Sequence, residues 1–267
     1  MDLSHELAVA LAAARTASEY VLAEYDAFAP IADAPADIST HVDRQAQELI
    51  LGRIREAFPN DGIRAEESTP GASGTPHYAE RVWIVDPIDG TRGFARKNGE
   101  FSVMIGFAIA GRVVLGVVAE PVVGRTTYAT AGSGCWVVAG ESEPVQCRVS
   151  RCGDLASATM VQSHTKIGSK PKPVVEAIRP AKVFETYSAG IKLAMVARGE
   201  VELYVNDYRN FHDWDACAGH ILVEEAGGKM TLFDGGSVTY TGPVERRGLL
   251  ATNGLLHEEC VRRLMTI

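Results

Sequence analysis

The apolar residues near the start of the chain recur with the spacing of amphipathic helices. From Ser4, which is placed to cap the first helix, apolar side chains follow every three or four residues as far as Val21. The same spacing returns between Val42 and Phe58, and the turn-forming residues 59–62 end that run. We therefore predict two N-terminal helices.

After a polar loop rich in Gly and Pro at 68–80, the pattern changes to short apolar runs separated by turns. The first run ends on Asp86, and the others cover 101–111, 112–121, 125–132 and 134–138. Runs of this length with short connections predict an antiparallel meander.

From about residue 146, strand-like and helix-like segments alternate. We predict strands at 158–163, 182–186 and 201–205, and helices at 173–179, 188–198 and 214–226. The whole pattern predicts two domains of mixed α+β and α/β class. Residues 1–145 form a domain with an antiparallel sheet, and residues 146–267 form a smaller α/β domain.

Composition and charge narrow the class of protein. Of the 267 residues, 46% are hydrophobic and 22% are charged, and the formal net charge is −8. An acidic chain disfavours a nucleic-acid polymer as partner and leaves room for a small anionic substrate held by local cations or metal. The sequence contains no C-x-x-C pair and no apolar run of membrane-spanning length, and its first residues have the pattern of an acidic amphipathic helix rather than that of a secretory leader. We expect a cytoplasmic protein with reduced thiols and no membrane partner.

The clearest chemical signal is the stretch WIVDPIDGTRGF at 83–94, in which an apolar run reaches Asp86 and Asp89 follows. Asp-Pro and Asp-Gly are common in turns, and Thr91 is a fair helix cap, so a simple turn accounts for these residues. A site accounts for them as well, because two carboxylates suit Mg²⁺ and a helix start after Gly90 suits a phosphate. This stretch alone leaves both interpretations open.

Three further acids lie in separate segments of the chain. Each has an ordinary explanation: Asp43 complements a helix dipole, Glu66 lies on a solvated surface, and Asp215 caps the helix at 214–226. Neither periodicity nor spacing shows that these acids converge with Asp86 and Asp89.

Taken together, the motifs EES, DPIDGTRGF and WDACAG followed by EEAGG resemble those of the inositol monophosphatase family of lithium-sensitive, Mg²⁺-dependent phosphomonoesterases. Their order and separations match over nearly the whole chain. Two departures, Ala65 for the glycine before the acid pair and Cys217 for another small residue, touch no ligand. The resemblance implies a layered αβαβα sandwich of the sugar-phosphatase type, and it suggests a homodimer.

The same resemblance implies roles for individual residues. Two or three Mg²⁺ ions would be held by Glu66, Asp86, Asp89, Asp215 and the backbone carbonyl of Ile88. Gly90 and Thr91 would bind the phosphate, and Asp43 would be an additional metal-associated acid. We predict that Glu66, with Thr91, orients and deprotonates an attacking water, with Asp43 as a rival or auxiliary base.

The segments around these motifs look more like the 3'(2'),5'-bisphosphate nucleotidase branch, which hydrolyses adenosine 3',5'-bisphosphate, than like the inositol branch. The likeness is carried by TRGFARKNGEFSV, MVQSHTK and YSAGIKLAMVARGE. It implies that Lys192 contacts the second phosphate. The candidate substrate contacts are Ser163, His164, Ser188, Lys192 and Arg209.

Two departures count against this branch. Ala189 stands where the branch usually has serine, and Asn206 stands where it usually has arginine, so two phosphate donors are lost. Arg209 is the candidate replacement. We predict a 3'(2'),5'-bisphosphate nucleotidase and keep two alternatives: a phosphatase of inositol 1-phosphate or another sugar monophosphate, and a non-catalytic phosphate-binding homologue.

Overall fold

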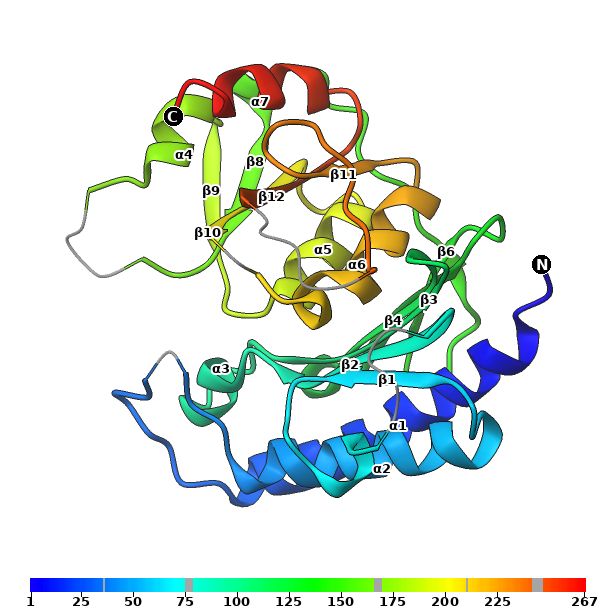
Figure 1. Ribbon diagram of the computed structural model, residues 1–267. Helices are drawn as coiled ribbons and strands as arrows, with labels where there is room; N and C mark the ends of the chain where they lie inside the picture. Colours follow the sequence, from blue (N-terminus) through cyan, green and yellow to red (C-terminus); the bar gives the residue numbers. More distant parts are fainter. Residues whose placement is uncertain (36, 75–78, 166–169, 210, 242–246) are drawn as a thin grey trace.

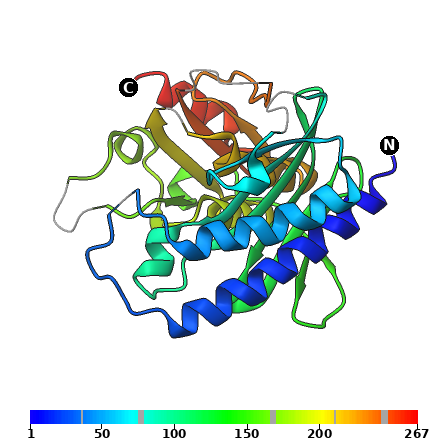
Figure 2. The same cartoon turned by 60° about the horizontal axis from the view of Figure 1, so that its bottom comes forward.

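Two long helices, α1 (Ser4–Ala27) and α2 (His41–Ala57), lie side by side against one face of a sheet and form the outermost layer of the protein (Figures 1 and 2). The computed structural model describes residues 1–35, 37–74, 79–165, 170–209, 211–241 and 247–267. Apolar residues of both helices pack against the sheet, among them Ala14 of α1 and Ile54 of α2. The two helices predicted from apolar spacing are confirmed.

The start of α1 differs from the prediction by one position. Ser4 is the first helical residue rather than the cap, and its N–H donates to the Asp2 carboxylate at 3.0 Å. The negative charge of Asp2 also complements the positive end of the helix dipole. Asp2 therefore performs the role that the sequence assigned to Ser4.

The larger sheet supplies the second layer. Within the described residues it has seven strands in the order β1-β2-β3-β4-β5-β6-β7, with β1 parallel to β2 and the other pairs antiparallel. The predicted meander is confirmed, and β1 extends it. The strands are β1 (Gly62–Ala65), β2 (Arg81–Asp89), β3 (Ser102–Ile109), β4 (Arg112–Glu120), β5 (Arg125–Thr130), β6 (Cys135–Ala139) and β7 (Val145–Gln146).

Strand β2 does not end at Asp86, as the sequence predicted, but continues to Asp89 through a bulge. Asp86 lies opposite Met104 and Asp89 lies opposite Ser102, so three steps along β2 match two steps along β3. Side chains three residues apart in a regular strand point to opposite faces. The extra residue of the bulge restores the alternation, and both carboxylates therefore point to the same face of the sheet.

That face is covered by α5 (Ala189–Ala197) and α6 (Asp213–Glu225), which form the third layer (Figure 1). Most of α6 is buried because a sheet lies on each side of it. The helix approaches the larger sheet closely at Gly116, where a Cβ atom would lie 2.1 Å from the carbonyl oxygen of Ala218. Glycine at this position allows α6 to pack directly on the strands.

A smaller sheet and two short helices complete the layers (Figure 1). In the described part of the chain this sheet has five strands in the order β11-β12-β10-β8-β9, and α4 and α7 cover its outer face. The short helix α3 follows β2. The bounds are β8 (Thr159–Gln162), β9 (Lys182–Glu185), β10 (Leu203–Arg209), β11 (Lys229–Thr231), β12 (Arg247–Thr252), α3 (Thr91–Ala95), α4 (Pro173–Ile178) and α7 (His257–Leu264).

The predicted αβαβα fold class is confirmed by this arrangement. The last three elements, β11, β12 and α7, were not predicted, because short segments carry too little periodicity. The division into domains at residue 145 stays a prediction: the larger sheet ends with β7, yet α5 and α6 pack against both sheets. Among the described residues, no helix is long and apolar enough to cross a membrane.

Candidate metal and phosphate site

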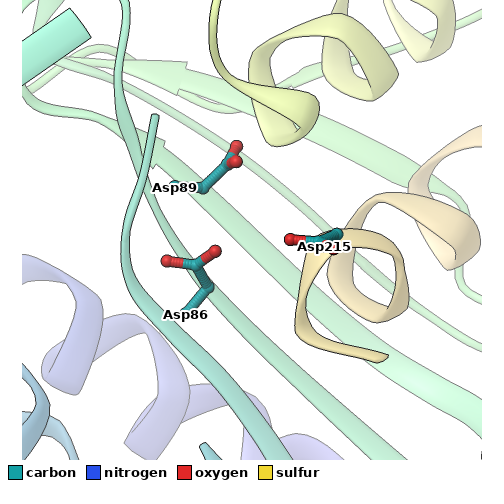
Figure 3. Close-up of side chains that lie close together, drawn as sticks. All are labelled: Asp86, Asp89 and Asp215. Carbon is teal, nitrogen blue, oxygen red and sulfur yellow. The ribbon is translucent and has the colours of Figure 1, made fainter. Parts of the chain in front are cut away.

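Three aspartates converge where β2 meets the start of α6 (Figure 3). One carboxylate oxygen from each of Asp86, Asp89 and Asp215 lies within 4.8 Å of the others. Asp86 and Asp89 come from the two sides of the β2 bulge, and Asp215 comes from the first turn of α6. Carboxylates this close repel one another, so the arrangement is typical of a cation site.

Several site acids use one carboxylate oxygen to satisfy the N-terminus of a helix. Asp215 Oδ2 accepts the N–H of His212 at 2.7 Å, and Asp89 Oδ2 accepts the N–H of Gly190 at 2.7 Å and the Ser188 hydroxyl. Asp43 Oδ2 accepts the N–H of its own helix cap at 2.9 Å. These bonds fix each carboxyl group and leave the second oxygen for another partner.

Asp86 differs from these acids. Its Oδ1 is buried and has no hydrogen-bond partner among the described residues, which is costly for a carboxylate unless a cation binds. Burial, followed by repulsion from Glu66, Asp89 and Asp215, raises the pKa of Asp86 well above its usual range. Oxygen donors alone, one of them unpartnered, fit a hard dication such as Mg²⁺.

The neighbouring acids are perturbed for the same reasons. Glu66 keeps exposed surface at the rim, but the protein atoms around its carboxyl group and the nearby Asp215 raise its pKa to about 8. Burial and the proximity of Asp89 raise the pKa of Asp215 to about 7. Without a cation, the cluster therefore retains protons near neutral pH.

The last residues of β2 and the turn that follows place the Ile88 carbonyl group and Thr91 at the site. Gly90 has a φ of +88°, and a Cβ atom there would lie 2.6 Å from the carbonyl oxygen of Glu100, so only glycine fits. The Thr91 hydroxyl lies 2.9 Å from both the Ile88 carbonyl oxygen and Asp43 Oδ1. Thr91 is the first residue of α3 rather than its cap, and its side chain connects Asp43 to the site.

A cavity of about 590 Å³ extends from the acid cluster. Most of the residues predicted for the site line it, from both halves of the chain: Glu66, Asp86, Ile88, Asp89, Gly90, Thr91, Ser163, His164, Lys192 and Asp215. Asp43 and Ser188 do not line it. Both are fully buried behind the wall, where Asp43 contacts Thr91 and Ser188 contacts Asp89. The Arg209 backbone belongs to β10, and its side chain lies outside the described residues.

Lys192 belongs to a second group of cavity-lining residues, which we call the basic group, and it is bound by the protein itself. The basic group comprises Arg92, Ser163, His164, Tyr187, Lys192 and Tyr204. Its ammonium donates to Ser163 Oγ at 3.1 Å, the Thr186 carbonyl at 2.9 Å and the Tyr187 carbonyl at 2.8 Å. Three bonds use its three donors. Burial lowers the pKa of Lys192 to about 8.

Some residues of the basic group were not among the predicted site residues. Tyr187, Tyr204 and Arg92 line the cavity, and the Arg92 guanidinium lies 5.6 Å from the centre of the Tyr187 ring. Ser102 contacts Ser188 at 2.9 Å behind Asp89. Tyrosines and serines in apolar segments look alike whether they pack in a core or face a cavity, so the linear pattern held no signal for them.

Comparison with known proteins agrees with this geometry. The model of the inositol monophosphatase family matches residues 2–266. A fructose-1,6-bisphosphatase/inositol-1-monophosphatase of Thermotoga maritima is 34% identical and covers 85% of this chain and 82% of its own. The histidinol-phosphatase of Mycobacterium tuberculosis is 30% identical, with 98% and 99% covered. The 3'(2'),5'-bisphosphate nucleotidase CysQ of Escherichia coli is 30% identical, with 85% and 91% covered.

Solved structures share the fold over the full length. The Thermotoga maritima IMPase structure superimposes with a TM-score of 0.81 and 29% identity, covering 98% of this chain and 97% of that one. The inositol monophosphatase of Anabaena gives a TM-score of 0.81 and 28% identity, with 100% and 98% covered. The layered sandwich is therefore the fold of these proteins.

Proposed function

Because this chain belongs to the inositol monophosphatase family, and with it to the phosphoric monoester hydrolases, we propose that it is a Mg²⁺-dependent 3'(2'),5'-bisphosphate nucleotidase. The observation that carries this proposal is one cavity lined by two kinds of side chain. The acid cluster is suited to cations, and the basic group contributes Arg92, Lys192 and tyrosine rings. A substrate with two phosphates and an aromatic base matches both groups.

Two or three Mg²⁺ ions are assigned to the acid cluster. The assigned ligands are Glu66, Asp86, Asp89, Asp215 and the Ile88 carbonyl oxygen. When bound, Mg²⁺ supplies Lewis-acid stabilisation of the phosphoryl charge and makes a nucleophilic water available at neutral pH. The buried Asp86 Oδ1 supports this assignment, because it has no hydrogen-bond partner among the described residues.

The protein's own groups bind the phosphate and move the proton. We assign the backbone N–H groups of Gly90 and Thr91 to the scissile phosphate, since the first N–H groups of a helix have no acceptor within it. Glu66 lines the cavity and acts as the base, and Thr91 orients the attacking water. Asp43 lies behind Thr91, so it takes up a proton only through the Thr91 hydroxyl.

Arg92 is assigned to the second phosphate. Its side chain lines the cavity, and its buried Nε has no hydrogen-bond partner in the described part of the chain. A guanidinium binds phosphate through paired N–H donors. Lys192 acts indirectly: Ser163 Oγ accepts one of its N–H bonds, which leaves the Ser163 hydroxyl proton for the substrate. Arg92 and the Ser163 hydroxyl together replace the serine and arginine donors that are missing at Ala189 and Asn206, which both line the cavity.

The alternatives differ in the part of the substrate that contacts the basic group. The named relatives include inositol monophosphatases and a histidinol-phosphatase as well as CysQ proteins, so a sugar monophosphate is the second candidate. A non-catalytic phosphate-binding homologue is the third candidate. It is opposed by the presence of all the site acids.

The test is phosphate release from adenosine 3',5'-bisphosphate, adenosine 3'-monophosphate, inositol 1-phosphate and histidinol phosphate. Each substrate is assayed with Mg²⁺, with EDTA and with Mg²⁺ plus Li⁺. We expect the highest kcat/KM on the bisphosphate, a lower value on the 3'-monophosphate because it lacks the second phosphate, and loss of activity in EDTA. A preference for inositol 1-phosphate or histidinol phosphate would overturn the substrate assignment alone. If no phosphate is released from any of the four substrates, with or without Mg²⁺, the result would favour a non-catalytic binding protein.

A further inference from the structure

A buried ion pair joins β1, which leads to Glu66, to the start of α6, which carries Asp215. Arg64 of β1 contacts Asp213, the first residue of α6, and the two side chains are only 10% and 8% exposed. The Arg64 guanidinium also donates to the Tyr240 carbonyl oxygen at 3.4 Å. Neither Arg64 nor Asp213 lines the cavity in the described part of the chain.

Each member of this pair stands two residues before a site acid. Arg64 faces α6, since Ile84, its register partner, packs in the same core cluster as α6 residues. Glu66 follows the last residue of β1, and its N–H donates to the Val85 carbonyl oxygen at 3.1 Å, which keeps it beside Asp86 of β2. Asp213 and Asp215 share the first turn of α6.

The pair opposes the repulsion within the cluster. Glu66, Asp86 and Asp215 carry like charges when ionised, and this repulsion tends to separate the start of α6 from β1 and β2. The opposite charges of Arg64 and Asp213 attract the same two elements in a buried setting, where charges are poorly screened. The attraction therefore acts where the acids alone would move apart.

We propose that Arg64 and Asp213 are positioning residues for the metal site: their ion pair holds Asp215 at the start of α6 against Glu66 and the aspartates of β2, so that these acids face one site. The inference rests on the proposed role of these two acids as Mg²⁺ ligands. It does not depend on which phosphate ester is hydrolysed.

An effect of local charge and an effect of ligand positioning predict opposite changes in Mg²⁺ affinity when Arg64 is replaced. If only the local charge mattered, Arg64→Met would remove a cation near the site and tighten Mg²⁺ binding, whereas Asp213→Asn would weaken it. If the pair positions the ligands, both substitutions weaken binding. The double variant would then be no worse than either single variant, because the same interaction is lost in each.

The experiment is isothermal titration calorimetry of Mg²⁺ into the full chain, with thermal unfolding measured in parallel. We expect Arg64→Met and Asp213→Asn each to raise the Kd for Mg²⁺ about tenfold, as loss of a group that orients metal ligands typically does. Arg64→Lys should recover part of the loss. The Mg²⁺ concentration that gives half-maximal activity should rise by the same factor as the Kd.

Arg81→Met is the matched control. It breaks the Arg81–Asp61 pair, which joins β2 to the residue before β1 at 2.8 Å within the N-terminal half, and it should lower Tm without changing Mg²⁺ affinity. If Arg64→Met lowers Tm but keeps the wild-type Kd, or tightens it, the inference is overturned. If Arg64→Met does not fold, Arg64→Lys and Asp213→Asn decide by the same comparison. A wild-type chain that binds no Mg²⁺ would overturn the proposed metal site and this inference together.

Discussion

The acid cluster and the basic group of the cavity are held in different ways. In the acid cluster, Asp89 and Asp215 each give one oxygen to a helix N-terminus, and Asp86 keeps a buried oxygen without a partner among the described residues. In the basic group, Lys192 is satisfied by three protein acceptors, and His164 contacts Glu100 at 2.6 Å. A cation would supply the partner that the acid cluster lacks, whereas much of the basic group is satisfied by the protein itself. Substitutions should accordingly have larger effects in the acid cluster.

The largest effect is expected for Asp89→Asn. The amide keeps the size of the side chain but supplies no negative oxygen, so kcat should fall by about 10³-fold, the upper range for loss of one electrostatic partner of a transition state. Steady-state kinetics at saturating Mg²⁺ measure the loss, and Tm checks the fold. Asp154→Asn, at an exposed cap far along the chain, is the control and should be neutral. Near-normal turnover by Asp89→Asn would sink the proposed mechanism.

The next largest effect should come from Thr91. Thr91→Val removes the hydroxyl that lies between Asp43 and the Ile88 carbonyl, and kcat should fall about 10²-fold, the lower range for a group that assists proton transfer. Thr91→Ser keeps the hydroxyl and should stay within a few-fold of the wild type. Equal losses in the two variants would mean that the methyl group, and not the hydroxyl, matters.

The raised pKa values in the acid cluster also predict how the stability of the fold varies with pH. The folded-state pKa values of Glu66 (about 8) and Asp215 (about 7) are raised above their unfolded values, so the folded chain binds protons more tightly than the unfolded chain. Stability in EDTA should therefore fall, and Tm with it, as pH rises from 5 to 8. Most of this change should come from Asp215, because Glu66 is exposed and solvent screens its charge. Saturating Mg²⁺ should remove or reverse this trend, because the ionised acids bind it. A Tm in EDTA that rises over this range would show that the cluster is not strained when empty.

The smallest effect is expected in the basic group. Arg92→Met should raise KM for adenosine 3',5'-bisphosphate about tenfold, or 1.4 kcal/mol, and leave KM for adenosine 3'-monophosphate nearly unchanged. The difference arises because only the first substrate carries the phosphate assigned to Arg92. Arg53→Met, an exposed change on α2, is the control. A parallel loss on both substrates would remove Arg92 from second-phosphate recognition.

Much of this protein follows from local sequence. The helical spacing before Phe58 predicted α1 and α2, and the apolar runs up to residue 138 predicted most of the larger sheet, because periodicity is a property of neighbouring residues. The motifs also supplied Asp86, Asp89 and Asp215 as candidate ligands. A carboxylate can bind a cation in any fold, so these ligands could be proposed before the fold was known.

Convergence was decided only by the tertiary structure. Asp86 and Asp89 share a face because of a bulge that depends on pairing with β3, and a regular strand would have separated them. The placement of Ser188 behind the cavity wall, and the meeting of Arg64 with Asp213, depend on packing between segments far apart in the chain. A linear pattern records the side chains that each segment offers. Which of them meet is determined by how the sheets and helices pack, since that packing sets the distances between elements.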